Sequence, residues 1–359
     1  MIPPEEFLVT TAVDEVDFTN SDVSLREAVI SANHHAGLQE ITFAPALSGS
    51  TIVLSAGRLE LIDDVTITGP GSELFTIDAG GVSAILTVDG GDVTVSGLTL
   101  TNAVGTFGGA VENISGNLTI QDSVISNSSA EAGGGIGNAG NLTLERVVVS
   151  DNSAEIGGGI DNAGIATIID STFTRNSATG ANVFGGGGIS NTAVSSATRG
   201  TLTLVNSTVY DNTSDALGGG IWNFGTLTAI NSTIAGNSSA ADFGGGIYHD
   251  GLELNLTNVT VAGHFEGGGI ASDDGSTMTV NNTLIAGNMN NAAAADVIGT
   301  ADLTGRAMNS LIGDSSTAAN LTDGTGGNIV GVDWTTVLVN SGGLPTSVSY
   351  THLTLPTKA

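Results

Sequence analysis

Short runs of alternating apolar and polar residues recur along the chain, each bounded by glycine or asparagine. Leu118-Thr-Ile120, Leu142-Thr-Leu144, Leu202-Thr-Leu204 and Met278-Thr-Val280 show the alternation. A period of two residues predicts β-strands with one buried face. Glycine and asparagine tolerate left-handed backbone, so they mark the corners between strands. The pattern therefore predicts many short strands joined by tight corners.

A Gly-rich tripeptide followed by an aliphatic residue divides the middle of the chain into units. The aliphatic residues are Val111, Ile136, Ile160, Ile189, Ile221, Ile247 and Ile270. The distances between them are 25, 24, 29, 32, 26 and 23 residues. This period is too short for a four-stranded propeller blade, and helical repeats would show a 3.6-residue periodicity. One coil of three strands fits, so the sequence predicts an all-β fold, a right-handed parallel β-helix.

Stacked coils bring equivalent side chains into columns, and we expect the aliphatic residues to form one internal column. Most units carry an asparagine two residues further on, and His249 takes that place in one unit. A second series has an apolar residue three positions before an asparagine, from Val124/Asn127 to Ile285/Asn288, and His264 interrupts it. We expect Asn127 through Asn288 to form an asparagine ladder of mutually bonded amides.

The N-terminal region predicts a cap on the solenoid. Ser24-Leu-Arg-Glu27 has the form of a capping box that opens a helix reaching about His34. The helix has an apolar stripe made of Leu25, Ala28, Val29 and Ala32. An open solenoid end would expose its core and its strand edges, so we assign residues 1–40 to a cap.

The rest of the chain divides into three parts that differ in how regular their predicted coils are. We expect less regular coils over residues 41–102, regular coils over 103–290 and an irregular C-terminal part over 291–346. Residues 347–359 resemble the conceptual translation of a transposon-type sequencing adapter and are left out of the interpretation. The first residues lack the basic and apolar regions of a signal peptide, so either the protein is not exported in this way or its true N-terminus is missing. The adapter-like segment leads us to expect that natural sequence once continued past Thr346.

The charge and composition of the chain limit the classes of partner that it can bind. The 359 residues carry 36 acidic and seven basic side chains and a net charge of −29. Nucleic acid is a poor partner and anionic membrane surfaces are disfavoured, because both are bound through Lys and Arg. The absence of Cys excludes disulfides and thiolate metal sites. We expect a self-repelling monomer without a membrane span or a cofactor, whose charge suits Ca²⁺ without defining a site.

Three segments resemble a known group of proteins. Val23-Ser-Leu-Arg-Glu-Ala-Val29 is similar to the CSLREA-type N-terminal motif of bacterial extracellular β-helix proteins, with Val23 in place of Cys. The Gly-Gly-Gly-Ile units resemble repeats of polymorphic outer-membrane proteins and autotransporter-like passengers. Asn309–Gly313 with Asn328–Gly331 resembles the closing segment of that group. The resemblance covers nearly all of residues 7–346 and implies secretion or display on the bacterial cell surface, often in adhesion.

One column of the predicted coils is a candidate binding face. The residue between the aliphatic residue and the asparagine should point away from the core, and that column reads Glu112, Gly137, Asp161, Ser190, Trp222, Tyr248 and Ala271. We expect Trp222 and Tyr248 to stack on an exposed face, where aromatic rings beside Asp161 and Glu112 suit sugar binding. The alternative is that the two rings shield sheet edges or are covered by a loop.

A loop at Thr192–Gly200 lengthens one coil and carries Arg199. Functional residues often lie on such loops, so Arg199 joins the candidate glycan site. The alternative is a tolerated surface insertion.

Catalytic sites on the same scaffold are the competing interpretation. Pectate lyases share the predicted fold and use carboxylate-bound calcium with a basic residue. The candidate residues here are Asp151, Asp161, Asp211, Arg146 and Arg175. A polyanionic substrate would be repelled by this chain, so a hydrolase with two carboxylates fits the charge better.

Metal sites have weak candidates. His249 and His264 each replace a corner asparagine, which favours hydrogen bonding over metal binding. Asp273-Asp274-Gly275 is either a loose calcium-binding turn or a solvated turn. The sequence therefore favours a non-enzymatic, adhesin-like surface or secreted protein that contacts polysaccharide or host glycan. A carbohydrate-active enzyme is the alternative, and a purely structural spacer is the third interpretation.

Overall fold

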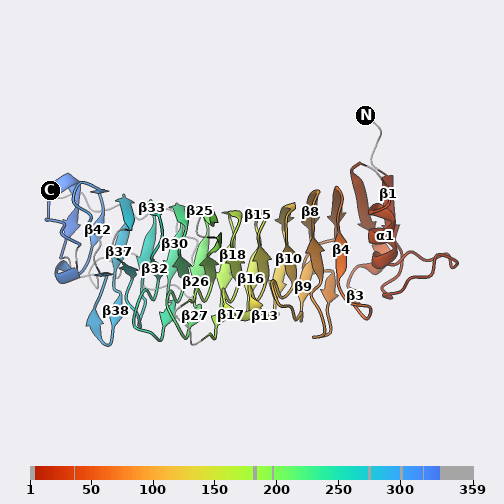
Figure 1. Cartoon of the computed structure of the whole chain (residues 1–359), viewed down its shortest axis with the longest axis horizontal. Coiled ribbons are helices and arrows are strands. Elements are labelled where there is room, and N and C mark those ends of the chain that lie inside the picture. The colour runs from red at the N-terminus through yellow and green to blue at the C-terminus, as the bar shows by residue number, and fades with distance from the viewer. Residues whose placement is uncertain are drawn as a thin grey trace.

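The protein is an elongated rod of stacked β-coils with a cap at its N-terminal end (Figure 1). The computed structural model describes residues 5–35, 37–180, 184–195, 198–273, 276–299, 302–317 and 319–331. Strands of successive coils pair in parallel, and parallel strands joined by a full coil take the right-handed connection. The chain is therefore a right-handed parallel β-helix, as the sequence predicts. The adapter-like residues 347–359 lie outside the described residues.

Three long sheets and one short sheet form the sides of the rod. Within the described residues sheet A has 12 strands: β1 (Glu5–Val9), β2 (Gln39–Phe43), β5 (Val65–Thr68), β8 (Asp92–Ser96), β11 (Asn117–Gln121), β15 (Asn141–Glu145), β19 (Ile165–Ile169), β25 (Thr201–Val205), β29 (Thr226–Ile230), β33 (Glu253–Thr257), β36 (Thr277–Asn281) and β41 (Ala307–Met308). Sheet B, in the same part of the chain, has 12 strands: β3 (Thr51–Val53), β6 (Thr76–Asp78), β9 (Thr99–Thr101), β12 (Val124–Ser126), β16 (Val148–Ser150), β20 (Thr172–Thr174), β26 (Thr208–Tyr210), β30 (Thr233–Ala235), β34 (Thr260–Ala262), β37 (Leu284–Ala286), β42 (Leu311–Ile312) and β43 (Ile329–Val330).

Sheets C and D complete the coils. Over the same described ranges sheet C has 10 strands: β4 (Leu59–Leu61), β7 (Leu86–Val88), β10 (Val111–Asn113), β14 (Ile136–Asn138), β18 (Ile160–Asn162), β22 (Ile189–Asn191), β28 (Ile221–Asn223), β32 (Ile247–His249), β35 (Ile270–Ser272) and β40 (Val297–Gly299). Sheet D, again among described residues, has five: β13 (Ser129–Ala132), β17 (Ser153–Ile156), β21 (Ser177–Ala178), β27 (Thr213–Ser214) and β31 (Ser238–Ser239). The remaining elements are α1 (Leu25–Ala32), the hairpins β23 (Ala193–Ser195)–β24 (Thr198–Arg199) and β38 (Met289–Asn290)–β39 (Ala293–Ala294), and three 3₁₀ turns (Pro45–Leu47, Ser315–Thr317 and Thr325–Gly327).

The core consists of aliphatic columns that run along the rod. The predicted column from Val111 to Ile270 is in register on sheet C, and each of its seven members is fully buried. The glycines before these residues allow close packing, since a Cβ built on Gly219 would lie 2.3 Å from the carbonyl oxygen of Ser238. The Gly-rich units are therefore places where neighbouring coils approach through their backbones.

The asparagine after each sheet C strand belongs to a buried ladder. Its members are Asn113, Asn138, Asn162, Asn191 and Asn223. Each donates its side-chain N–H to the side-chain oxygen of the next member over 2.7–2.8 Å. Asn223 donates to Nδ1 of His249 (2.9 Å), so His249 takes the place of an asparagine as predicted.

The second ladder begins one position later than the sequence suggests. β12 pairs with β16 so that Ile125, not Val124, belongs to the buried apolar column. Ser128, not Asn127, therefore lies over Asn152, and its backbone N–H donates to Asn152 Oδ1 (3.0 Å). Asn127 occupies the preceding corner with a φ of +52°. The prediction for Asn127 is wrong because a shift of one residue moves a side chain to the other face of a strand.

From Asn152 onward the second ladder follows the prediction, and its end is acidic. Its members are Asn152, Asn176, Asn212, Asn237, His264 and Asn288. His264 accepts the N–H of Asn237 at Nδ1 (3.0 Å), and burial lowers its pKa to about 4. Asn288 donates to the buried carboxyl of Asp296 (2.9 Å). His264 is therefore a neutral substitute for asparagine.

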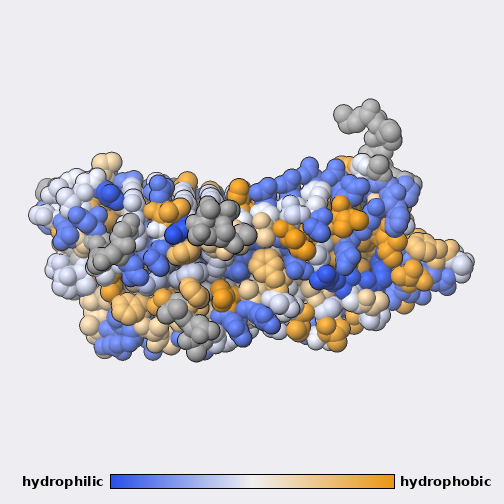
Figure 2. All heavy atoms as spheres, viewed as in Figure 1, coloured by the Kyte–Doolittle hydropathy of each residue, from blue (hydrophilic) through white to orange (hydrophobic). Residues whose placement is uncertain are grey.

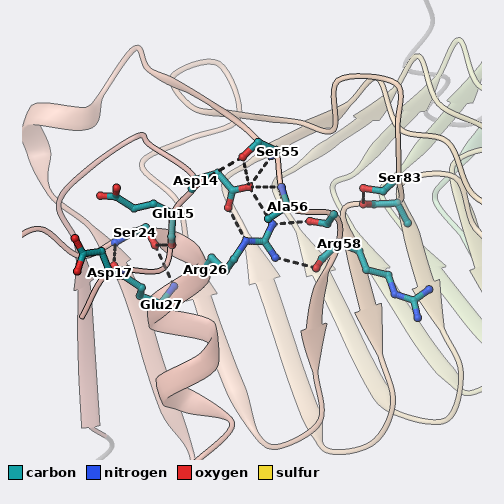
Figure 3. A network of polar contacts seen from close by, with 12 residues as sticks. Asp14, Glu15, Asp17, Ser24, Arg26, Glu27, Ser55, Ala56, Arg58 and Ser83 are labelled. Atoms are coloured by element: carbon teal, nitrogen blue, oxygen red, sulfur yellow. Dashed lines mark hydrogen bonds and ion pairs between the residues drawn. The ribbon is translucent and has the colours of Figure 1, made fainter. Parts of the chain in front are cut away.

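The predicted cap helix is present and is anchored by an ion pair. Ser24 and Glu27 form the reciprocal capping box, and α1 ends at Ala32, near the expected end. Arg26 donates to both carboxyl oxygens of Asp14 (2.7 and 3.0 Å) and to the backbone of residues 57 and 58 in the first sheet C coil (Figure 3). Strand β1 pairs with β2, so the N-terminal segment also extends sheet A. No helix in the described ranges is long and apolar enough to cross a bilayer.

Candidate functional site

The predicted outward column lies on sheet C, and its order along the rod is as predicted. The register of β10, β14, β18, β22, β28, β32 and β35 places Glu112, Gly137, Asp161, Ser190, Trp222, Tyr248 and Ala271 on consecutive coils. Trp222 and Tyr248 are direct cross-strand neighbours. The structure therefore brings these two rings together as the sequence expects.

The expected exposure of these rings is wrong. Trp222 is 4 % exposed and Tyr248 is 8 % exposed. Leu217, Phe224 and Ile298 pack against them. The rings do point away from the core, but neighbouring segments cover them, which is the alternative that the sequence left open.

A partly exposed aromatic cluster replaces the predicted open platform. Phe184, which is 46 % exposed, meets Trp222 edge-on with ring centroids 5.2 Å apart. Trp222 in turn stacks on Phe224 at 5.8 Å with only 4° between the ring planes. The Arg199 guanidinium lies 4.0 Å above the Phe224 ring and donates to the Phe224 carbonyl (2.9 Å). We call Phe184, Trp222, Phe224 and Arg199 the aromatic cluster.

The hairpin β23–β24 positions Arg199 in this cluster. It forms the long coil predicted at Thr192–Gly200, and the Gly200 N–H closes it by donating to the Thr192 carbonyl (2.7 Å). The sequence analysis identified Arg199 but missed Phe224. Residues two apart in an extended segment share a face, so the position of Phe224 two residues after Trp222 was a signal that could have identified it.

Carboxyl groups flank the cluster on its C-terminal side. The Tyr248 hydroxyl donates to the carboxyl of Asp273 (2.5 Å). Burial and this bond raise the pKa of Tyr248 above its ordinary range. Burial and the nearby Asp273 also raise the pKa of Asp250, while Arg199 opposes the shift. Asp273 thus bonds a side chain of the site, while Asp274 and Gly275 of the predicted calcium turn lie outside the described residues.

Asp161 lies on the N-terminal side of the cluster in a buried polar niche. It is 7 % exposed and accepts the Thr192 hydroxyl over 3.0 Å. Burial raises its pKa from 3.8 to about 6. The neighbouring Ser190 hydroxyl is fully buried beside this carboxyl. Ser190 separates Asp161 from Trp222, so the carboxyl does not border the ring directly.

Glu112 does not join the site. The coil of Gly137 separates it from Asp161. Its carboxylate accepts hydrogen bonds from Arg58 (3.1 Å) and Thr87 (3.3 Å). These bonds tie the first coils of sheet C to one another, which is a structural role.

The lyase candidates are spread over three parts of the coil. Asp151 and Arg175 form an ion pair of 2.7 Å at exposed corners after sheet B strands. Arg146 pairs with Asp122 (2.6 Å) at the corners after sheet A strands. Asp161, by contrast, lies within sheet C. The described residues contain no group of three or more histidine or acidic side chains placed to hold a metal ion.

Comparison with known proteins adds one structural likeness. No family model matches the chain, and no curated protein matches it. Among solved structures the chain is similar to the crystal structure of pectate lyase Pel9A, with 12 % sequence identity and a TM-score of 0.43, over 96 % of this chain and 89 % of that chain. The assignment of the fold stands on the strand register described above.

Proposed function

We propose that this protein is a non-catalytic β-helix of the bacterial cell surface or the extracellular medium, which contacts neutral glycans through the aromatic cluster. The observation that carries the proposal is the half-exposed Phe184 ring, supported from below by the edge-on Trp222. An aromatic ring fixed in this way offers a rigid apolar face to the C–H groups of a sugar. Arg199 lies over the Phe224 ring of the cluster and Asp273 bonds the neighbouring Tyr248, so these side chains can supply hydrogen-bonding groups for sugar hydroxyls.

The surface and the charge are consistent with this role. On the face that Figure 2 shows, hydrophobic residues reach the surface in separate patches among hydrophilic ones, not in one continuous band. A net charge of −29 opposes acidic polysaccharides, so a neutral glycan is the better partner. The resemblance to bacterial extracellular β-helix proteins supports the proposed location.

A glycan array tests the proposal with the full chain and the variants Phe184→Ala and Phe18→Ala. Phe18 is 63 % exposed and lies in the N-terminal cap, so it is the matched control. We expect Phe184→Ala to weaken the binding of neutral glycans about tenfold, or about 1.4 kcal/mol, and Phe18→Ala to leave it unchanged. An array without bound glycan, or equal losses in both variants, would rule the proposal out.

A carbohydrate-active enzyme remains the second candidate because of one group. The raised pKa of Asp161, about 6, suits proton transfer near neutral pH. Polysaccharide depolymerisation by the native protein, with loss of product formation in Asp161→Asn, would establish this candidate over the first. Binding without product would favour the non-catalytic protein.

A further inference from the structure

The outer face of sheet A carries a longer uninterrupted column of threonines than sheet B, where the longest run in the described residues is Thr172, Thr208, Thr233 and Thr260. The strands of this sheet follow one another along one long side of the molecule (Figure 1). The register of β5, β8, β11, β15, β19, β25 and β29 aligns seven threonines without interruption: Thr66, Thr94, Thr119, Thr143, Thr167, Thr203 and Thr228. We call these residues the threonine column.

The hydroxyls of the threonine column are available to solvent. Each of the seven side chains is half-buried by its neighbours on the sheet and faces outward. None of the seven hydroxyls forms a hydrogen bond with another residue in the described part of the chain. Two threonines of sheet B differ in this respect, since Thr99 bonds to the Ser72 carbonyl and Thr101 bonds to Ser126.

A second set of threonines makes the array two-dimensional. Thr201 and Thr226 precede Thr203 and Thr228 by two residues on the same outer face. The two directions of the array are set by the backbone, at about 4.8 Å between coils and about 6.7 Å along a strand. The spacing between coils is close to the shorter oxygen–oxygen repeat of the prism face of ice, and the spacing along a strand is somewhat shorter than the second repeat of that face.

The centre of this face is uncharged in a chain of net charge −29. The outward residues of β19, β25 and β29 are threonine, isoleucine and valine only. A row of corner asparagines, Asn206, Asn231, Asn258 and Asn282, borders the face with amides bonded to one another over 2.6–3.2 Å. Charged groups keep strongly bound hydration shells, which disturb an ordered layer of water. An uncharged face is therefore better suited to contact the lattice of ice.

Strand preference alone does not account for the column. Isoleucine and valine suit strands as well as threonine does, and they occupy the adjacent outward column at Ile169, Val205 and Ile230. The threonine column nevertheless keeps a methyl and a hydroxyl together on seven consecutive coils. A repeated pairing of these two groups suits an ordered layer of water, in which the methyl groups fill gaps and the hydroxyls take lattice positions.

From these observations we infer that the outer face of sheet A binds ice. The threonine column and the neighbouring Thr201 and Thr226 would order water at spacings that merge with a crystal face. A crystalline polysaccharide is the competing flat partner, but β19, β25 and β29 present no aromatic ring to stack on sugars. The inference is independent of the proposed glycan contact, which lies on sheet C.

The test uses a matched pair of double variants in the full chain. Thr203→Lys/Thr228→Lys places two charges in the threonine column, and Thr208→Lys/Thr233→Lys places them on sheet B in the same two coils. All four threonines are half-buried and point outward, so both variants should keep the melting temperature of the native protein. Thermal hysteresis and inhibition of ice recrystallisation are measured for all three proteins.

We expect the native protein and the sheet B variant to show thermal hysteresis and the sheet A variant to lose it. Absence of hysteresis and of recrystallisation inhibition in the native protein would overturn the inference, as would equal behaviour of the two variants. Sedimentation with microcrystalline cellulose or chitin is run in parallel. Adsorption that depends on the threonine column, without any effect on ice, would assign the face to polysaccharide and also overturn the inference.

Discussion

Single residues at the corners of the coil carry backbone conformations that most side chains avoid. Asp122, Arg146, Asp151 and Arg175 all have a φ between +48° and +59°. Asparagine and aspartate tolerate this left-handed region, whereas arginine does so rarely. Each arginine is held by an aspartate at the equivalent corner of the preceding coil. The two ion pairs are exposed, so they position the corners more than they stabilise the fold.

Asp161 offers a prediction at this scale, because its carboxyl favours folding only when protonated. Its pKa is about 6 in the folded state and 3.8 ordinarily. The contribution to stability is therefore present below about pH 4 and lost as the pH rises through 6. We expect Asp161→Asn to raise the free energy of unfolding at pH 7.5 by up to about 3 kcal/mol, and by less at pH 4.5. Urea unfolding at the two pH values measures the difference.

Asp151→Asn is the control for this experiment. Arg175 outweighs burial and holds the pKa of Asp151 below its ordinary value, so its charged form favours folding above about pH 4. This variant should gain no stability at pH 7.5. A loss of stability in Asp161→Asn at both pH values would show that the carboxyl makes contacts that an amide cannot replace.

Residue positions could be predicted from the sequence better than residue environments. The alternation of the strands placed Trp222 and Tyr248 on one outward column, and the structure agrees. Their burial depends on Phe184 and Leu217, which contact them from other parts of the coils. The sequence next to Trp222 and Tyr248 does not predict these contacts. The ladder prediction for Asn127 failed for a different reason, because asparagine suits both a ladder and a left-handed corner.

At the scale of elements, the cap shows how a helix is joined to a solenoid. Burial opposes ionisation of Asp14, but Arg26 and the backbone N–H groups of Ala56 and Ser55 hold the pKa of Asp14 below its ordinary value. Figure 3 shows the carboxyl between α1 and the loop that leads into β4. The helix was predictable from its capping box, whereas this ion pair links residues whose spacing follows no repeat.

We expect Arg26→Met to loosen the cap, because it leaves the nearly buried Asp14 carboxylate without its cation. Removing one partner of a buried ion pair costs about 3–5 kcal/mol. Hydrogen exchange of β1 and α1 should accelerate, while exchange in β28 and β32 should not change. Arg306→Met, an exposed arginine, is the control. Restoration of slow exchange by adding Asp14→Asn would confirm the cause, and unchanged exchange in Arg26→Met would refute it.

The hairpin β23–β24 is an element that the repeat could not predict in detail. The distances between aliphatic residues rise to 29 and 32 around it, so the sequence indicated extra residues there. It did not show that the extra segment folds as a hairpin whose Arg199 covers Phe224. A long coil reveals where an insertion lies, but its contacts depend on the coils beside it.

At the scale of the whole molecule, each coil pairs mainly with the coils on either side of it. The period of the Gly-rich units, with their internal aliphatic column, was sufficient to predict this architecture, since only stacked coils bury one such residue per unit. The sequence could not define the functional face in the same way. Every outward column repeats along the rod, and its chemistry depends on what covers it.

Because coils interact with their neighbours, removal of a whole coil should be tolerated. Deletion of residues 111–135 removes β10–β13 and joins Ala110 to Ile136, which keeps every column in register. We expect cooperative unfolding with a melting temperature within about 5 °C of the native protein, measured by circular dichroism. Deletion of residues 111–122 alone breaks the register and should abolish the cooperative transition. Failure of both deletions to fold would contradict the modular description.

One of the buried amide ladders has a direction, and this direction makes the rod electrically asymmetric. In the ladder that starts at Asn113, each amide donates to the side chain of the next coil toward the C-terminus. In the ladder that starts at Asn152, the amide N–H groups are shared between the next coil and carbonyls of the preceding coil, so their contributions largely cancel. Aligned amide dipoles add, as peptide dipoles do in a helix. The exposed row from Asn206 to Asn282 runs the opposite way, but water and salt screen it more strongly. The ladder from Asn113 to Asn223 therefore contributes a dipole along the long axis of the rod, with its positive pole toward the C-terminal coils.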